Sequence, residues 1–265
     1  MLLVMGNIRV KKLAISIVVI FLMTCASSIY AGTFLTKTYV FEGKKYLYEL
    51  YIPQESAPTT GWPVILFLHG SGESGYSAKK LKNSGIGRAI QENETLYHSI
   101  VIMPQIPDED NATIQQQGKY GNIYWNKINS QNYALSVLQY ITNKYESRID
   151  KSRIYLTGLS MGGSGTWRIA QNHPNIFAAI VPVAACQQLS ATYIANLKNI
   201  PIWVFHSLKD EACPVENTKI LVGAMKKING NILYTEYKQA NHPQTWKKAY
   251  SDANLLEWLL KQKRK

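Results

Sequence analysis

The sequence lacks the features that mark several large classes of protein. It has no internal repeat, no low-complexity linker, no cluster of metal-ligating residues and only three cysteines. The glycine-rich segment 71–75 has no lysine of the kind that a phosphate-binding P-loop requires. The net charge is +12, but the lysines are scattered and no glycine–aromatic RNA-binding motif occurs. We therefore expect no nucleotide cofactor, no metal and no nucleic-acid partner.

Residues 1–31 have the order of a secretory signal peptide. A basic segment precedes an apolar run at 13–23, and small residues follow it. The run is shorter than the roughly 20 residues that a membrane-spanning helix needs, so we expect no stable membrane span. We predict a secreted or periplasmic protein formed by residues 32–265. Lipid attachment at Cys25 is an alternative, although Thr24 replaces the small residue that precedes the cysteine in a lipoprotein box.

Strand and helix patterns alternate along residues 32–265, after a predicted β-hairpin at 36–52. Apolar runs typical of buried strands lie at 64–68, 100–103, 153–157, 178–183 and 202–205, and a last strand is expected at 232–237. Helical patterns lie at 133–145, 161–171, 215–228 and 252–261. This alternation predicts an α/β fold with a mostly parallel sheet flanked by helices. The connection before the strand at 202 is too short for a large cap domain.

A G-x-S-x-G motif at 158–162 carries the first chemical signal. A buried strand precedes it and a helix follows, which is the context of the nucleophile elbow of serine hydrolases. A side chain at either glycine would clash with the neighbouring strand or helix, so the chain can turn sharply only with glycine there. Ser160 is therefore the predicted nucleophile.

A serine nucleophile needs a base and an acid, which follow it in the chain order Ser, Asp or Glu, His. His242 follows the last predicted strand, so we place the base there in a loop, with His206 as the alternative. Asp210 follows the strand at 202–205 and is the predicted acid, with Glu211 as the alternative.

The oxyanion hole needs two backbone N–H donors. Met161, directly after the nucleophile, is predicted to supply one, and the glycine-rich loop 69–75 the other, at Ser71 or alternatively Gly72. The long irregular segment 105–130 follows a strand, where binding sites of such sheets lie. Its Trp125 is a candidate for stacking on a sugar or an aromatic acyl group.

Cys186 and Cys213 are the two cysteines outside the predicted signal peptide. Each follows a strand, and the ends of neighbouring strands can lie within disulfide distance. We hypothesise a disulfide that braces the loop of Asp210.

Three segments together resemble a known family. They are 66–73, 153–163 and 201–206, and 244–250 adds to the likeness. The chain resembles the secreted esterases labelled "predicted peptidases", which are related to polyhydroxybutyrate depolymerases, feruloyl and acetylxylan esterases and dienelactone hydrolases. Relatives often carry glycine before the catalytic histidine, whereas this chain has Asn241.

The resemblance implies an α/β-hydrolase fold and a metal-independent serine esterase, with the site residues named above. We expect a small-molecule or polysaccharide-borne ester as the substrate, since the missing cap indicates an open cleft. A serine peptidase of the same fold is one alternative. A catalytically inactive carbohydrate-binding protein is another. The sequence contains no signal for the oligomeric state.

Overall fold

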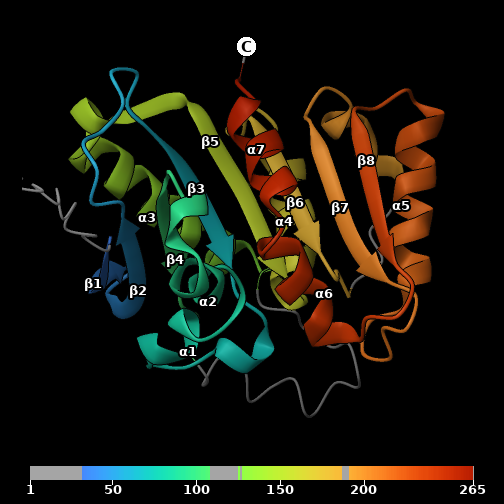
Figure 1. Cartoon of the computed structure of the whole chain (residues 1–265), viewed down its shortest axis with the longest axis horizontal. Helices are drawn as coiled ribbons and strands as arrows, with labels where there is room; N and C mark the ends of the chain where they lie inside the picture. The colour runs from blue at the N-terminus through green and yellow to red at the C-terminus, as the bar shows by residue number, and fades with distance from the viewer. Residues whose placement is uncertain (1–31, 108–124, 126, 187–190, 265) are drawn as a thin grey trace, which may run out of the picture. The chain divides into compact units, whose positions relative to one another are not determined.

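The computed structural model describes residues 32–107, 125, 127–186 and 191–264 (Figure 1). The predicted signal peptide and Cys25 lie outside these ranges. Within them, no helix combines the length and the apolar character that crossing a bilayer requires.

Eight strands form one sheet in the order β1-β2-β4-β3-β5-β6-β7-β8. Their bounds are β1 Thr33–Phe41, β2 Lys44–Ile52, β3 Trp62–Leu68, β4 Ile100–Pro104, β5 Ile149–Leu159, β6 Ala179–Val183, β7 Ile202–Ser207 and β8 Ile232–Tyr237. The pairs β1·β2 and β2·β4 are antiparallel, and every other pair is parallel. The predicted mostly parallel sheet is confirmed.

The local sequence explains both the buried parallel strands and the antiparallel hairpin. Every residue of β3 is buried, because the sheet is covered on both faces, and this explains its unbroken apolar run. The hairpin of β1 and β2 turns at Glu42 and Gly43, both at positive φ (48° and 77°). Two consecutive residues with positive φ form the tight turn that matches the twist of paired strands.

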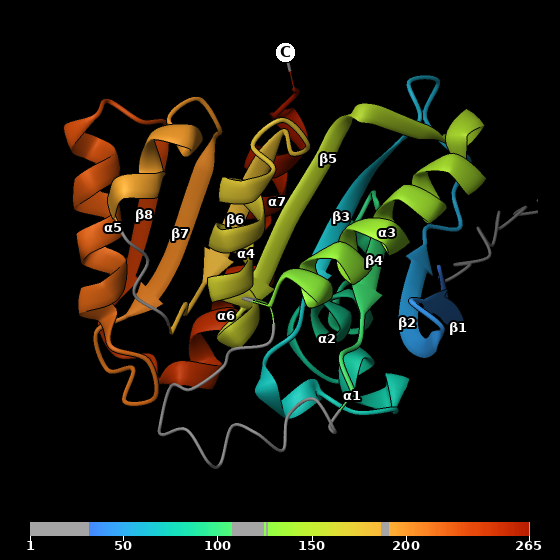
Figure 2. The same ribbon diagram turned by 180° about the vertical axis from the view of Figure 1, so that it is seen from behind.

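Helices cover the two faces of the sheet. Their bounds are α1 Ala78–Lys82, α2 Gly85–Glu92, α3 Ile128–Lys144, α4 Met161–Asn172, α5 Val215–Lys227, α6 His242–Tyr250 and α7 Ala253–Lys261. Helices α1, α2, α6 and α7 lie on the face shown in Figure 1, and α3, α4 and α5 lie on the face shown in Figure 2. A hydrophobic cluster fills each interface between sheet and helices.

Helices α1 and α2 were not predicted, and two further details differ from the sequence prediction. Helix α3 begins at Ile128, before the expected start, because the polar residues of its first turn hide the apolar periodicity. The segment after β8 was expected to be a loop, but helix α6 begins at His242. Between β6 and β7 the described residues form one short 3₁₀ helix, η6 (Ala191–Leu197), as the predicted short connection requires.

Candidate active site

Ser160 lies in a sharp turn between β5 and α4. Its backbone has φ 54° and ψ −116°, a region that costs energy for a residue with a side chain. A Cβ on Gly158 would lie 2.4 Å from the carbonyl oxygen of Gly162, and one on Gly162 would lie 1.9 Å from that of Leu68. Both positions therefore need glycine, for the reason inferred from the motif. The turn presents the Ser160 side chain at the carboxyl end of the parallel strands.

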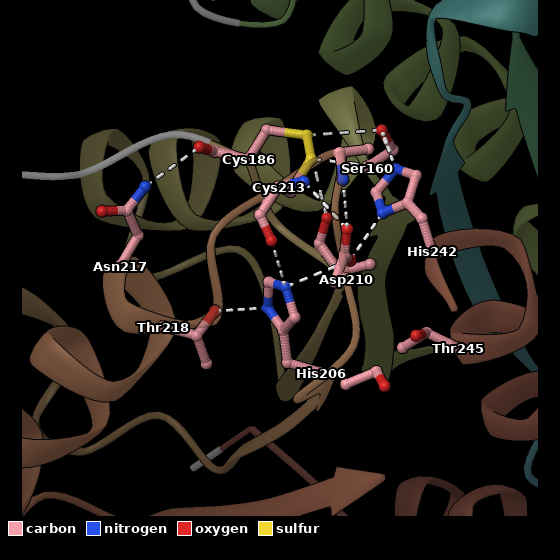
Figure 3. Close-up of polar contacts among 12 residues, drawn as sticks. Ser160, Cys186, His206, Asp210, Cys213, Asn217, Thr218, His242 and Thr245 are labelled. Carbon is pink, nitrogen blue, oxygen red and sulfur yellow. Dashed lines mark hydrogen bonds and ion pairs between the residues drawn. A yellow bond between two sulfur atoms is a disulfide. The ribbon is translucent and has the colours of Figure 1, made fainter. Parts of the chain in front are cut away.

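The structure brings together the three side chains predicted to act on the ester (Figure 3). Nε2 of His242 lies 2.9 Å from Oγ of Ser160, and Nδ1 of His242 lies 2.6 Å from Oδ2 of Asp210. An ionised carboxylate can only accept, so Nδ1 carries the proton and Nε2 is free to accept the serine hydroxyl proton. The acid alternative, Glu211, is exposed.

Helix α6 fixes the position of His242. The side chain of Asn241 accepts a hydrogen bond from the N–H of Gln244, whose side chain accepts one from the N–H of Asn241. This capping box stabilises the start of the helix. Asn241 thus has a structural role at the position where relatives often carry glycine.

Asp210 is held as a carboxylate by its neighbours. Burial alone would raise its pKa, but hydrogen bonds from His206, His242 and the N–H of Cys213 outweigh burial and hold the pKa well below its usual value. Oδ1 accepts from the N–H groups of Ala212 (3.1 Å) and Cys213 (2.8 Å). Asp210 is therefore an ionised carboxylate at neutral pH.

The two predicted oxyanion donors belong to different elements next to Ser160. Met161 opens α4, where the first N–H groups have no intrahelical acceptor. Ser71 opens the 3₁₀ helix η1 (Ser71–Glu73) in the loop after β3, and its N–H has no acceptor among the described residues. This loop reaches the nucleophile, since a Cβ on Gly70 would lie 3.5 Å from Cβ of Ser160.

Trp125 does not have the predicted position for substrate binding. Its side chain is fully buried, so no ligand can stack on it from solvent. Nε1 donates to the carbonyl of His69 at 3.0 Å, and the indole packs edge-on against the His69 ring. Gly165 of α4 leaves the space that the indole fills. Trp125 therefore holds the loop after β3 in place through its contacts with His69.

Cys186 and Cys213 are joined by a disulfide, with Cα atoms 4.4 Å apart. Sγ of Cys186 lies 3.4 Å from Oγ of Ser160, and Sγ of Cys213 lies 3.7 Å from Nε2 of His242. With His242, the two cysteines form the one group of metal-ligating side chains in the described part of the chain. The sulfurs are bonded to each other and cannot act as thiolate ligands, so this group does not fit a metal ion.

A cavity of about 290 Å³ opens between α2 and α6, next to the base. Its walls include Arg88, Pro243, Trp246 and Lys247. The half-buried Trp246 packs edge-on against the ring of His242, with centroids 4.9 Å apart. From the sequence, Trp246 near His242 is a candidate for stacking on a sugar or an aromatic acyl group, and packing against the last helix is the favoured alternative. The cavity offers an apolar ring, the Lys247 ammonium and the Arg88–Glu92 ion pair to a ligand.

The strand order and the contacts of Ser160 are those of an α/β hydrolase. Residues 42–259 match the protein family described as "Putative esterase", and the chain belongs to that family. It has the α/β-hydrolase fold, as the sequence predicted.

Three known proteins show the range of its relatives. Poly(3-hydroxyalkanoate) depolymerase C of Paucimonas lemoignei is 27% identical over 184 residues, 67% of this chain and 40% of that protein. A thermostable esterase of known crystal structure is 30% identical in sequence. The two structures match with a TM-score of 0.73 over 87% of this chain and 63% of that one. A feruloyl esterase module from Clostridium thermocellum, complexed with sinapinate, is 18% identical, with a TM-score of 0.62 over 88% of this chain and 89% of that one. The chain spans less than two thirds of the first two proteins.

Sequence reasoning missed one polar residue of the site. His206, considered only as an alternative base, is fully buried and lies 3.2 Å from Oδ2 of Asp210, on the side away from His242. The sequence signal for this contact was the spacing of four residues between His206, at the end of a strand, and Asp210.

Proposed function

We propose that the protein is an exported serine esterase that works through an acyl-enzyme on Ser160 and acts on acyl esters of polysaccharide. The hydrogen-bonded chain from Ser160 through His242 to Asp210 carries this proposal. Each neighbour in the chain is within hydrogen-bond distance in the order that nucleophilic catalysis requires.

In the acylation step, Oγ of Ser160 attacks the ester carbonyl while Nε2 of His242 takes the hydroxyl proton. The carbonyl oxygen becomes negative and accepts hydrogen bonds from the N–H groups of Met161 and Ser71. When the tetrahedral intermediate collapses, the bond to the alcohol oxygen breaks and His242 gives the alcohol its proton. Asp210 stabilises the imidazolium that exists between these two transfers.

In the deacylation step, a water molecule replaces the alcohol. His242 takes one proton from the water as its oxygen attacks the acyl carbonyl. The second tetrahedral intermediate then expels Oγ of Ser160, which recovers its proton from His242. The products are a free carboxylic acid and an enzyme ready for a second ester.

Three observations support a polymer-borne substrate. The connection between β6 and β7 spans residues 184–201, which is too short for a large cap domain, and a site without such a cap admits a bulky chain. Trp246 lines the cavity beside His242, where an aromatic acyl group could stack on the indole. The proteins that the chain is similar to include a poly(3-hydroxyalkanoate) depolymerase, named for a polymeric ester, and a feruloyl esterase module, named for an aromatic acyl group.

The test is a substrate panel for the protein without residues 1–31. It comprises p-nitrophenyl acetate, methyl ferulate, acetylated xylan, feruloylated arabinoxylan oligosaccharides, poly(3-hydroxybutyrate) granules and a peptide p-nitroanilide. We expect kcat/KM on a glycan ester to exceed that on the matching small ester by about tenfold or more. Hydrolysis of only the small soluble esters would overturn the polysaccharide assignment, and efficient peptide cleavage would favour a peptidase.

Trp246→Ala sharpens the acyl-group assignment. We expect KM for feruloyl esters to rise by about tenfold, while acetyl esters change little, because an acetyl group does not reach the indole. Trp258→Ala is the matched control, since Trp258 is also half-buried but packs against Trp203 on the outer part of the sheet. Equal effects of the two substitutions on feruloyl esters would contradict this role of Trp246.

A further inference from the structure

His206 is a buried titratable residue that the proposed mechanism does not use. It lies in the last part of β7, and its side chain has no exposed surface. Both ring nitrogens have partners (Figure 3). Nε2 lies 3.2 Å from Oδ2 of Asp210 and 3.0 Å from the carbonyl oxygen of Cys213, and Nδ1 lies 2.7 Å from Oγ1 of Thr218 in α5. A buried imidazole placed in this way is part of a network, not of an apolar core.

The partners define the tautomer of His206. The carbonyl of Cys213 and the carboxylate of Asp210 can only accept, so Nε2 must carry a proton and donate to both oxygens. Nδ1 of a neutral ring is then an acceptor, and the hydroxyl of Thr218 is its donor. The acceptors at Nε2 thus fix the tautomer of His206, and the hydroxyl of Thr218 adapts to it and holds the ring at Nδ1.

The Asp210 carboxylate is therefore clamped between two imidazole rings. Oδ1 accepts two backbone N–H groups, and Oδ2 accepts from His206 on one side and His242 on the other. Without the N–H of His206, nothing on that side would hold Oδ2 in line with His242. The carboxyl group could then rotate or recruit another donor, and the imidazole of His242 would lose its alignment with Ser160.

We propose that His206, with its ring held by Thr218, is a positioning residue for Asp210 in ester hydrolysis, a role that rests on the proposed acyl-enzyme mechanism. It contacts no substrate, and it acts through the geometry of the acid. A shift of about 1 Å in a catalytic group costs about 100-fold in rate, so loss of the clamp should lower kcat by about 10- to 100-fold. Substrate binding is untouched, so KM should stay within about twofold.

His206→Met and His206→Gln form the decisive pair. The glutamine amide can place an N–H near the position of Nε2, whereas methionine fills the space without a donor. Rates on p-nitrophenyl acetate are divided by the concentration of sites that a fluorophosphonate titrates, so that unfolded protein does not count. We expect His206→Met to lose about 10- to 100-fold in kcat at nearly constant KM, and His206→Gln to recover most of that loss. Equal kcat per titrated site in the two variants, or a wild-type kcat in His206→Met, would overturn the proposal.

Thr218→Val keeps the test decisive if His206→Met does not fold. The substitution preserves shape and removes the hydroxyl that holds Nδ1. We expect kcat per titrated site to fall by several-fold, with KM nearly constant. The control is Thr142→Val, the same change at a buried threonine of α3 whose hydroxyl bonds only to Gln139. Unchanged kcat in Thr218→Val, or an equal fall in Thr142→Val, contradicts the proposal. A wild type that neither turns over nor labels refutes the proposed esterase mechanism itself.

Discussion

The loop after β3 and the loops after β7 and β8 form the two sides of the Ser160 site, and different contacts hold them. Residues 69–73 form the oxyanion side, and buried side chains hold them by hydrogen bonds to their backbone carbonyls. Trp125 donates to the carbonyl of His69, and Gln105 donates to that of Glu73 at 2.7 Å. Asp210 and His242, the acid–base side, are held by charged hydrogen bonds and by a disulfide at Cys213.

This difference separates two tasks. An oxyanion hole needs fixed backbone donors, and a loop anchored on buried side chains supplies them without any change of charge. On the acid–base side, His242 gains and loses a proton during the reaction while Asp210 stays ionised. The contacts that hold these two side chains must therefore tolerate a charge. We therefore expect substitutions on the acid–base side to alter the protonation behaviour of the enzyme, and those on the oxyanion side to lower kcat alone.

Asp210→Asn should give the largest effect on the acid–base side. The amide cannot hold His242 in the tautomer that accepts from Ser160, so we expect kcat to fall by about 1,000- to 10,000-fold. The pH dependence of kcat/KM on p-nitrophenyl acetate should also change, because the base loses its carboxylate partner. Glu211→Gln, at the neighbouring exposed acid, is the control and should behave as the wild type. A large loss of activity in Glu211→Gln would show that Glu211, and not Asp210, is the acid.

Ser71→Pro should give the largest effect on the oxyanion side. Gly70 is extended (φ −80°, ψ 177°), as a residue before proline should be, and proline fits the first position of a helix. The change therefore deletes one N–H and leaves the backbone in place. We expect kcat to fall by about 100- to 1,000-fold without a shift of the pH profile.

Ser71→Ala keeps the N–H and serves as the control for this prediction, with most of the activity retained. If Ser71→Pro remains fully active while Gly72→Pro does not, the second donor is Gly72.

The disulfide should contribute mainly to stability. It closes a loop with a sequence separation of 27, for which the chain-entropy relation gives about 3.5 kcal/mol. We expect the double variant Cys186→Ser/Cys213→Ser to lower the free energy of unfolding by about this amount in urea titrations at pH 7. A thiol assay on the denatured, unreduced wild type checks the bond, and two titrating thiols would refute it.

Trp125→Phe should give the smallest effect. The ring still fills the space, but the buried carbonyl of His69 loses a donor, which costs about 1–3 kcal/mol of stability. We expect a modest fall in kcat and no change in KM, measured on a small and a polymeric ester. A rise in KM for glycan esters alone would restore the role in substrate binding that the structure does not support.

The sequence predicted the parts of the fold and site that local pattern determines. The apolar run of β3 and the glycines around Ser160 each have one structural explanation, and chain order was enough to find Asp210 and His242. Helix α6 was missed although Asn241 and Gln244 have the spacing of a capping box. Its short, lysine-containing stretch has little apolar periodicity.

Long-range packing accounts for what could not be predicted. Burial of Trp125 depends on the space left by Gly165, which lies 40 residues further along the chain in a different element. The contact of His206 with Asp210 depends on how the loop after β7 folds back beneath the acid. No periodicity or motif specifies the first contact, and the spacing of four residues suggests the second without specifying how the loop folds.

The most direct test of the central claim is to trap the acyl-enzyme. Wild-type protein and Ser160→Ala are mixed with p-nitrophenyl acetate, quenched before steady state and digested for mass spectrometry. We predict a burst of p-nitrophenol equal to the enzyme concentration and an acetyl group on the peptide that contains Ser160, with both absent in the variant. Turnover without a burst or a modified peptide, or full activity in Ser160→Ala, would contradict nucleophilic catalysis by Ser160.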